Sequence, residues 1–535
     1  MTSAETYRFD EYLAALGGDW YEEDPLLQRW LARSRLSDAE SDVVRRFGRA
    51  AATRHREIAD WVERAENLPY LQEQDPYNER SRKLVIPAET RHTLAEIHGS
   101  GIWKAGLDER VRYAIVYLLN QNSEFGVTCS TACTDGMARI LRRHGDDARS
   151  RAVVEKLEKA TPADWIHGAQ FVTEIQGGSD AVTNELRAVP LENGLYALSG
   201  RKWFCSNATA DYWLVTARLD GSPAGHRGVS LFCVPRLRDG RDNGHVLQRL
   251  KDKLGTRALP TAEVDFEGAT GWPVGPLDAG LKNMVAVVLT TSRVHCVVAA
   301  AAAVRRAERE ARAYAGFRLA FGKRLEEHPL IAASLRRLRE AADRFSAGAF
   351  ATVDAWVAAT AGEKPEGARS GTAAEARPKA PTGAPTGAPS DAATDPRLWA
   401  RILVSLAKAV STRQSNQHIY EAMMILGGNG IEERFCALPR LWRDAAILES
   451  WEGPYTLLLM QALEDMARFG VGGRETEFLA AGLGREAAEA HVDALAAVLA
   501  APTEEENILR WAELAPRIYR SFEDRALAQL IGAGG

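Results

Sequence analysis

Apolar residues recur at two different spacings along the chain, and the change of spacing marks separate structural regions. Between residues 7 and 160 they follow helical spacing, as in Ile115–Leu119 and Ala138–Leu141. This pattern predicts an N-terminal helical domain over residues 1–168. From about Ala169 the spacing becomes two, which predicts strands and a small middle β-domain over 169–275. The strand candidates, separated by turns such as 192–194, are Tyr196–Ser199, Trp213–Ala217, Val229–Val234 and Ala262–Phe266.

Helical spacing returns near Leu281 and persists to about Phe469, which predicts a C-terminal helical bundle over 276–470. Residues 362–395 interrupt it with a segment rich in Ala, Pro, Thr and Gly. Such a composition buries too little apolar surface to offset the entropy of ordering, so we expect a disordered loop between two helices. A helical C-terminal extension is expected over 471–535. The fold class predicted from these regions is α+β.

Composition narrows the class of protein. The 535 residues are 46% hydrophobic and carry a net charge of −5, which gives no general nucleic-acid or membrane signature. The apolar run 284–304 contains Arg293 and His295, and a charge at mid-bilayer is costly, so a buried helix is favoured over a membrane span. The chain shows no signal peptide at its start, no Cys-x-x-Cys pair and no metal-ligand cluster. We therefore expect a cytoplasmic protein with reduced cysteines, no metal and no membrane contact.

Three segments rich in small, hydroxyl and aromatic residues hold the candidate chemistry. Val172–Asp180 and Gly200–Asn207 lie among the expected strands, where small residues at strand ends let a planar cofactor approach the backbone. The third segment runs from Gly427-Gly428-Asn429-Gly430 through Trp442-Arg443-Asp444 to Trp451-Glu452-Gly453. Over residues 75 to 465 this combination resembles the acyl-CoA dehydrogenase flavoprotein family. With the run 249–255 it looks most like the AidB-type branch.

The resemblance implies FAD as the cofactor and the family's order of helical domain, β-domain and helical bundle. In the family, the position of Phe204 packs on the flavin and that of Ser206 faces flavin N5. Arg318 matches an arginine that meets the FAD pyrophosphate of a neighbouring subunit, a task suited to the forked guanidinium donors. The implied FAD-binding positions are Val172, Thr173, Ser179, Phe204, Ser206, Arg318, Phe321, Met424, Gly427, Gly428, Pro454 and Thr456.

Two of these positions depart from the family pattern. Met424 and Pro454 stand where relatives usually carry Gln and Thr, so the affinity for FAD or the placement of its adenine is expected to differ.

Dehydrogenation of an acyl thioester requires a base for a weakly acidic α-proton while hydride leaves the β-carbon. A carboxylate in a dry pocket suits this role, because desolvation raises its pKa. Glu452 occupies the family position of the base, and Glu449 is the local competitor. Arg293 matches a buried arginine behind the base, and we assign Glu452 and Arg293 to the catalytic machinery. Arg443 and Asp444 are expected to form a structural ion pair.

The main hypothesis is therefore an FAD-dependent oxidoreductase acting on an acyl-CoA, assembled as a homodimer or homotetramer. Its electron acceptor would be an electron-transfer flavoprotein or oxygen. The AidB-type resemblance supplies a rival, an alkylation-response flavoprotein that binds DNA and dehydrogenates little. From Val471 onward, however, the chain has eleven Asp and Glu against six Arg and no Lys, which disfavours DNA as a partner. A flavin scaffold that has lost acyl-CoA chemistry is the third alternative.

Overall fold

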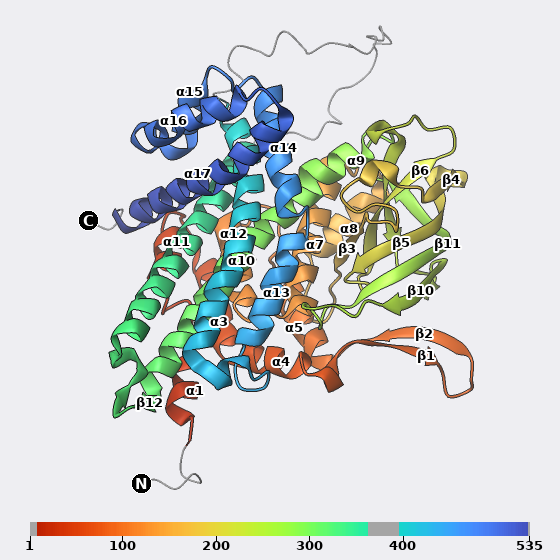
Figure 1. Ribbon diagram of the computed structural model, residues 1–535. Coiled ribbons are helices and arrows are strands. Elements are labelled where there is room, and N and C mark those ends of the chain that lie inside the picture. The colour runs from red at the N-terminus through yellow and green to blue at the C-terminus, as the bar shows by residue number, and fades with distance from the viewer. Residues whose placement is uncertain (1–7, 362–394, 533–535) are drawn as a thin grey trace.

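The computed structural model describes residues 8–361 and 395–532. Helices, a β-domain and further helices follow one another along the chain, so the predicted order is confirmed. The β-domain lies on one side of the molecule and the long helices on the other (Figure 1). The disordered loop expected at 362–395 falls outside the described residues except for Asp395, which caps a helix.

The N-terminal region is built from eight helices within the described residues. Local sequence explains several of their starts: the side chain of Asp24 accepts hydrogen bonds from the backbone of the next helix, and Ser37 with Glu40 forms a capping box. The helices are α1 (Asp10–Leu16), α2 (Pro25–Leu31), α3 (Asp38–Ala52), α4 (Arg54–Val62), α5 (Ala88–His98), α6 (Glu109–Asn120), α7 (Phe125–His144) and α8 (Ala148–Glu158).

One part of this region is not helical, so the prediction for residues 7–160 is wrong there. Strands β1 (Tyr70–Gln74) and β2 (Arg80–Val85) pair as an antiparallel hairpin. Asn78 in its turn has a φ of 64°, a conformation that Asn tolerates well. Both strands are half-buried or exposed along their length, so they lack the apolar alternation on which a strand prediction depends. The hairpin projects beside the β-domain, next to β10 (Figure 1).

The middle region forms a seven-stranded mixed sheet in the order β10-β11-β5-β4-β6-β3, with β7 paired to both β11 and β6. All four strand candidates fall inside its strands. Its interior holds aromatic residues such as Phe171, Trp213 and Phe232. The strands are β3 (Gly168–Phe171), β4 (Arg187–Pro190), β5 (Tyr196–Ser206), β6 (Tyr212–Leu219), β7 (Val229–Pro235), β10 (His245–Leu250) and β11 (Thr261–Pro273), and the short pair β8 (Leu237–Arg238) and β9 (Arg241–Asp242) lies outside the sheet.

The second helical region is a bundle of long helices. Its first helix runs from Gly280 to Phe317 and includes a π-helical turn at 284–289; it is apolar and long enough to cross a membrane, yet 78% of its most apolar window is buried within the protein. The bundle consists of α9 (Gly280–Asn283), α10 (Thr290–Phe317), α11 (Pro329–Thr360), α12 (Pro396–Leu426), α13 (Leu438–Ser450) and α14 (Tyr455–Arg468). A small turn, β12 (Leu319–Ala320) with β13 (Lys323–Arg324), follows α10.

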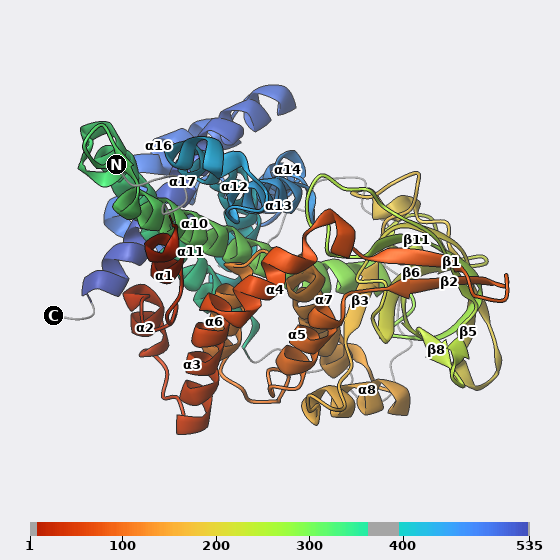
Figure 2. The same ribbon diagram turned by 90° about the horizontal axis from the view of Figure 1, so that it is seen from below.

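The C-terminal extension is helical and packs on this bundle, mainly against α11, α12 and α14. It comprises α15 (Glu475–Leu483), α16 (Arg485–Leu499) and α17 (Glu504–Gly532). Seen from below, the extension lies at the end of the molecule away from the sheet (Figure 2).

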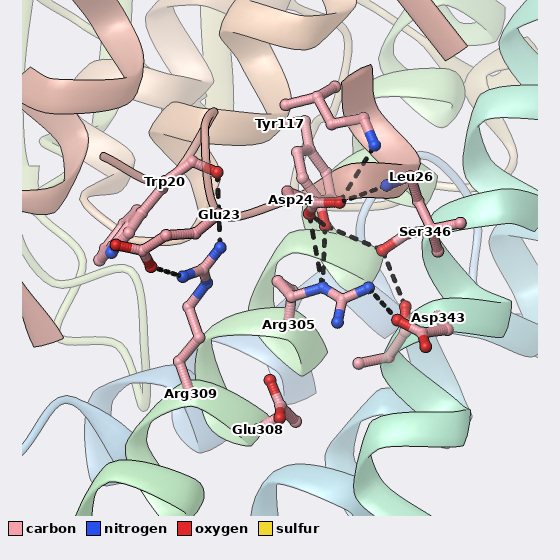
Figure 3. Close-up of polar contacts among 12 residues, drawn as sticks. Trp20, Glu23, Asp24, Leu26, Tyr117, Arg305, Glu308, Arg309, Asp343 and Ser346 are labelled. Atoms are coloured by element: carbon pink, nitrogen blue, oxygen red, sulfur yellow. Dashed lines mark hydrogen bonds and ion pairs between the residues drawn. The ribbon is translucent and has the colours of Figure 1, made fainter. Parts of the chain in front are cut away.

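Buried ion pairs tie the N-terminal helices to the bundle (Figure 3). Arg305 of α10 is 3.5 Å from Asp24 and 2.6 Å from Asp343 of α11, while Arg309 is 2.5 Å from Glu23. Tyr117 of α6 donates to Asp24 at 3.1 Å. Because buried charges are costly unless paired, these contacts fix how α2, α6, α10 and α11 meet.

Candidate active site

The loop that carries Glu452 has an unusual backbone held in place by two buried cations. It follows the end of α13, and Glu452 has a φ of 55°, in the left-handed region that costs a non-glycine residue roughly 1–3 kcal/mol. Lys408 Nζ donates to the carbonyl oxygens of Glu449 at 2.8 Å and Gly453 at 2.7 Å. Arg293 Nε donates to the carbonyl of Glu452 itself at 2.9 Å. The carbonyl of Glu449 at the end of α13 and the carbonyls of Glu452 and Gly453 in the loop are thus satisfied from α12 and α10, which stabilises the strained turn.

The carboxyl group of Glu452 faces the β-domain. Gln170 of β3 donates from Nε2 to Glu452 Oε1 at 2.9 Å and lies 3.2 Å from Ser292 Oγ. Burial raises the pKa of Glu452 to about 7, against the opposing charges of Arg293 and Lys408 and the hydrogen bond from Gln170. A carboxyl group that changes protonation near neutral pH can serve as a general base.

The cations beside Glu452 bind backbone rather than its carboxylate. Arg293 also donates to Gln461 Oε1 at 3.1 Å, and burial lowers the pKa of Arg293. Burial likewise lowers the pKa of Lys408 to about 8. Trp451 packs edge-on against Phe125 at 5.4 Å, which gives the loop an apolar wall.

A buried ion pair orders the strand ends where the cofactor positions cluster. Lys202 of β5 is fully buried; its Nζ donates to Glu174 Oε1 at 2.6 Å and to the carbonyl of Val172 at 3.1 Å. Burial lowers the pKa of Lys202 to about 8. Burial alone would raise the pKa of Glu174, but the Lys202 charge and hydrogen bonds hold it below its usual value. The backbone N–H of Trp203 donates to the Thr173 carbonyl at 2.9 Å, so 172–174 is clamped to β5.

The next residues of β5 present a surface for a flat ligand. Phe204 lies on β5 and its side chain is 49% exposed. Ser206, two residues on, is half-buried and lies 3.1 Å from the hydroxyl of Thr261. Lys251 Nζ lies 4.6 Å from the Phe204 ring. Ser179 is exposed on the loop after β3.

The remaining cofactor positions form two groups. Pro454 and Thr456 are exposed at the start of α14, directly after Glu452. Arg318 and Phe321 follow the far end of α10, and Met424, Gly427 and Gly428 end α12. At 1.5 Å per helical residue, Arg318 lies about 37 Å along α10 from Arg293. The structure therefore brings Thr173, Phe204 and Glu452 to one end of the long helices and leaves Arg318 and Phe321 at the other.

Comparison with known proteins identifies the family. The model of the acyl-CoA dehydrogenase middle domain matches residues 169–269, and that of the acyl-CoA dehydrogenase C-terminal domain matches 387–467. A solved structure named Bd2924 apo-form has a TM-score of 0.83 at 27% identity, covering 96% of this chain and 98% of that one. The chain therefore contains the middle and C-terminal domains of the acyl-CoA dehydrogenase family.

Two further relatives place it within that family. It is 34% identical to AidB of Escherichia coli K12 over 55% of this chain and 47% of AidB, so the match spans less than half of AidB. The structure of Caenorhabditis elegans ACDH-11 in complex with C11-CoA has a TM-score of 0.79 at 25% identity, covering 95% of this chain and 87% of ACDH-11. The resemblance inferred from the motifs, including its AidB-like character, is confirmed.

Sequence reasoning missed the polar residues that hold this candidate site in shape. Gln170, Lys408 and the Lys202–Glu174 pair are absent from the predicted set. Lys408 gave a usable signal, because it is the one charge in the apolar run from Ile402 to Val410. Among the described residues no cluster of His, Cys, Asp or Glu could hold a metal ion, and all six cysteines are free.

Proposed function

We propose that the protein is an FAD-dependent acyl-CoA dehydrogenase in which Glu452 removes the α-proton of the substrate. The observation that carries this proposal is the carboxyl group of Glu452, with a pKa raised to about 7 at the end of a loop strained at that residue. A base of this strength is mostly ionised slightly above neutral pH and still accepts a proton effectively. Acyl-CoA as the substrate class follows from family membership and from the acyl-CoA complex of ACDH-11.

The residues at the strand ends fit a flavin. Phe204 offers a half-exposed ring for stacking, with the hydroxyl of Ser206 beside it, and the Lys202–Glu174 pair holds the backbone at Thr173. At the far end of the helices, a Cβ built on Gly427 or Gly428 would meet nothing within 4 Å, which leaves that backbone open to a ligand. Bound FAD would supply the hydride acceptor. The chain's own residues orient the thioester, exclude water around Glu452 and take up the proton at its carboxylate.

The separation of the two groups of cofactor positions favours a homo-oligomer. Arg318 lies too far along α10 to share a site with Glu452 of the same chain, whereas the corresponding residue of a second copy could complete it. Three apolar side chains next to Arg318 are largely exposed in the single chain, as an interface would require: Leu319 (61%), Phe321 (98%) and Leu330 (83%). We therefore propose a homodimer or homotetramer in the cytoplasm, with an electron-transfer flavoprotein as the electron acceptor.

The decisive experiment compares two matched variants. Purified yellow protein is titrated anaerobically with a panel of acyl-CoA thioesters while flavin bleaching is followed. Glu452→Gln should retain FAD and bind substrate but bleach about 10²–10⁴-fold more slowly, because general-base catalysis is lost. Glu449→Gln is the control: its side chain is 35% exposed and lies 3.9 Å from Arg413. Equal rates for wild type and Glu452→Gln would refute the base assignment.

The AidB-like alternative makes a different prediction in the same preparation. A protein whose flavin no acyl-CoA reduces, and which binds duplex DNA in a salt-sensitive way, would support it. The surface of the C-terminal extension argues against DNA, because its arginines sit among acids on the same helix. Arg510 pairs with Glu506 at 3.4 Å and Arg520 with Asp524 at 3.1 Å. Because each of these two arginines is paired with an acid, neither contributes to an unpaired basic surface of the kind that binds DNA.

A further inference from the structure

A large cavity lies between the β1–β2 hairpin and the β-domain, away from Glu452. Its volume is about 950 Å³, within the range of small-molecule sites. The hairpin and β10 form two of its walls, and α5 with the loop before β3 forms a third. Glu452, Thr173, Phe204 and Ser206 are not among its lining residues, so it is separate from the candidate active site.

The cavity is basic although the protein as a whole is acidic. Five cations line it, Arg80, Arg82, Lys83, Arg91 and Arg236, against three acids, Asp211, Asp242 and Glu267. No ion pair is recorded for any of the five within residues 8–361 and 395–532, and of their side chains only that of Arg82 makes a recorded hydrogen bond. Asp211 and Asp242 each lie 3.9 Å from a histidine, His167 and His245 respectively.

Arg236 is the most informative of these residues. It follows β7, and its backbone N–H donates to the carbonyl of Asp211 at 2.8 Å, which fixes the start of the side chain. Its Nε is buried without a hydrogen-bond partner in the described part of the chain. The neighbouring His167 and His245 supply no negative charge, and burial together with the Arg236 charge lowers the pKa of each. A buried guanidinium nitrogen without an acceptor is costly unless a ligand supplies one.

The wall of the cavity that the hairpin forms is also rich in cations. Arg82 has a φ of 43°, a conformation that is rare for a long side chain and that concentrates at functional sites. Its guanidinium donates to Gln248 Oε1 at 2.6 Å and to the Leu247 carbonyl at 3.2 Å, which anchors the hairpin on β10. Arg80 and Lys83, on either side of Arg82, are exposed and remain available to a ligand.

We propose that this cavity binds a small organic phosphate, with the half-buried Arg236 as the anchor and Arg80, Lys83 and Arg91 at the rim. Guanidinium groups match phosphate oxygens in geometry and charge, and several cations around a single cavity favour more than one phosphate. Trp165, stacked on His98 at 5.3 Å, adds an aromatic wall for the organic part. The site is independent of the proposed dehydrogenation.

Calorimetric titration of the FAD-loaded protein with ADP and with inorganic pyrophosphate tests the proposal. Loading with FAD first prevents either probe from entering the flavin site. Both probes should bind saturably, ADP more tightly if the organic part contributes. Arg236→Gln should weaken binding at least about tenfold, because a hydrogen bond to a charged group is lost. Arg241→Gln, which removes the same charge from an exposed position on β9 outside the cavity, is the matched control.

The outcomes separate this site from the substrate site. Absence of saturable binding, or binding unaffected by Arg236→Gln, would overturn the proposal. Binding that saturating free CoA abolishes, while the arginine variants leave it intact, would assign the phosphates to the substrate site and overturn it equally. If Arg236→Gln does not fold with normal flavin content, the double variant Arg80→Gln/Arg91→Gln decides, since both residues are exposed and its affinity should still fall.

Discussion

Replacing Gln170 by Leu should shift the pH dependence of flavin reduction towards alkaline pH. Gln170 supplies the one hydrogen bond recorded to the carboxyl group of Glu452 within the described chain, from Nε2 to Oε1 at 2.9 Å. That bond lowers the pKa of Glu452, against burial, which raises it to about 7. Leucine is close to glutamine in size and removes the donor without opening a large space. The ionised carboxylate therefore loses stabilisation while the protonated form is little affected.

The magnitude follows from the charge on the acceptor. A hydrogen bond to a charged group contributes about 1.5–3 kcal/mol. Because one pKa unit corresponds to about 1.36 kcal/mol, the pKa of Glu452 should rise by roughly 1–2 units. The wild-type base is about half ionised at pH 7, so its ionised fraction there, and with it the rate of flavin bleaching, should fall about 5- to 50-fold. Above the new pKa the rate should return towards that of the wild type.

The assay is the rate of flavin reduction under anaerobic, substrate-saturated conditions between pH 6 and 10. The wild-type rate should rise through about pH 7, since proton removal requires the ionised base. Gln417→Leu, the same substitution on an exposed part of α12, should leave this profile unchanged. A Gln170→Leu enzyme with an unshifted midpoint, or with a loss that is equal at every pH, would refute the assignment of Gln170 as the residue that sets the basicity of Glu452.

Three further outcomes are expected. The pKa of Glu452 in the folded protein lies above its ordinary value, so the ionised carboxylate destabilises the fold above about pH 7 and has no such effect at low pH. Glu452→Gln should therefore raise the melting temperature more at pH 8 than at pH 5. Lys202→Met leaves Glu174 buried without its cation, so it should lower the free energy of unfolding by about 3–5 kcal/mol and release FAD. The double variant Lys202→Met/Glu174→Leu should recover part of that stability, as thermal unfolding would show. In the Arg318→Ala variant, loss of FAD and dissociation of the subunits should occur together, as flavin absorbance and light scattering would show. An FAD-loaded wild-type monomer would contradict the shared site.

The fold was predictable where the apolar side chains of a helix or strand are buried. Val229–Val234 alternates little and is apolar except for Ser230, and it forms most of β7, which pairs with β6 and β11. The periodicity from Leu281 onward likewise matches the helix that begins at Gly280. The β1–β2 hairpin was missed for the opposite reason. Its strands are stabilised by their pairing with each other and by the hydrogen bond from Arg82 to the Leu247 carbonyl of β10. They do not bury an apolar face, so the sequence pattern did not predict strands.

The candidate site was predictable as a set of motifs but not as an electrostatic arrangement. The Trp451-Glu452-Gly453 motif located the carboxylate, because its residues are adjacent in sequence. Gln170 lies 282 positions from Glu452 and reaches it only through the packing of β3 against the bundle. Which way a lone polar side chain points depends on that packing. A single sequence indicates that such a residue is present, but it does not indicate the atom that the residue contacts.

The way the two cations are used explains how a carboxylate can be held near positive charge and remain a base. A direct ion pair with Arg293 or Lys408 would lower the pKa of Glu452 by about 1–3 units and leave a weak base. Here both cations bind backbone carbonyls of the loop, at 2.7–2.9 Å. Their hydrogen bonds stabilise the left-handed backbone at Glu452, while their charges reach the carboxyl group only from a distance. Burial therefore remains the dominant influence on its pKa. Arg293 and Lys408 therefore fix the position of the base without lowering its pKa as much as a direct salt bridge would.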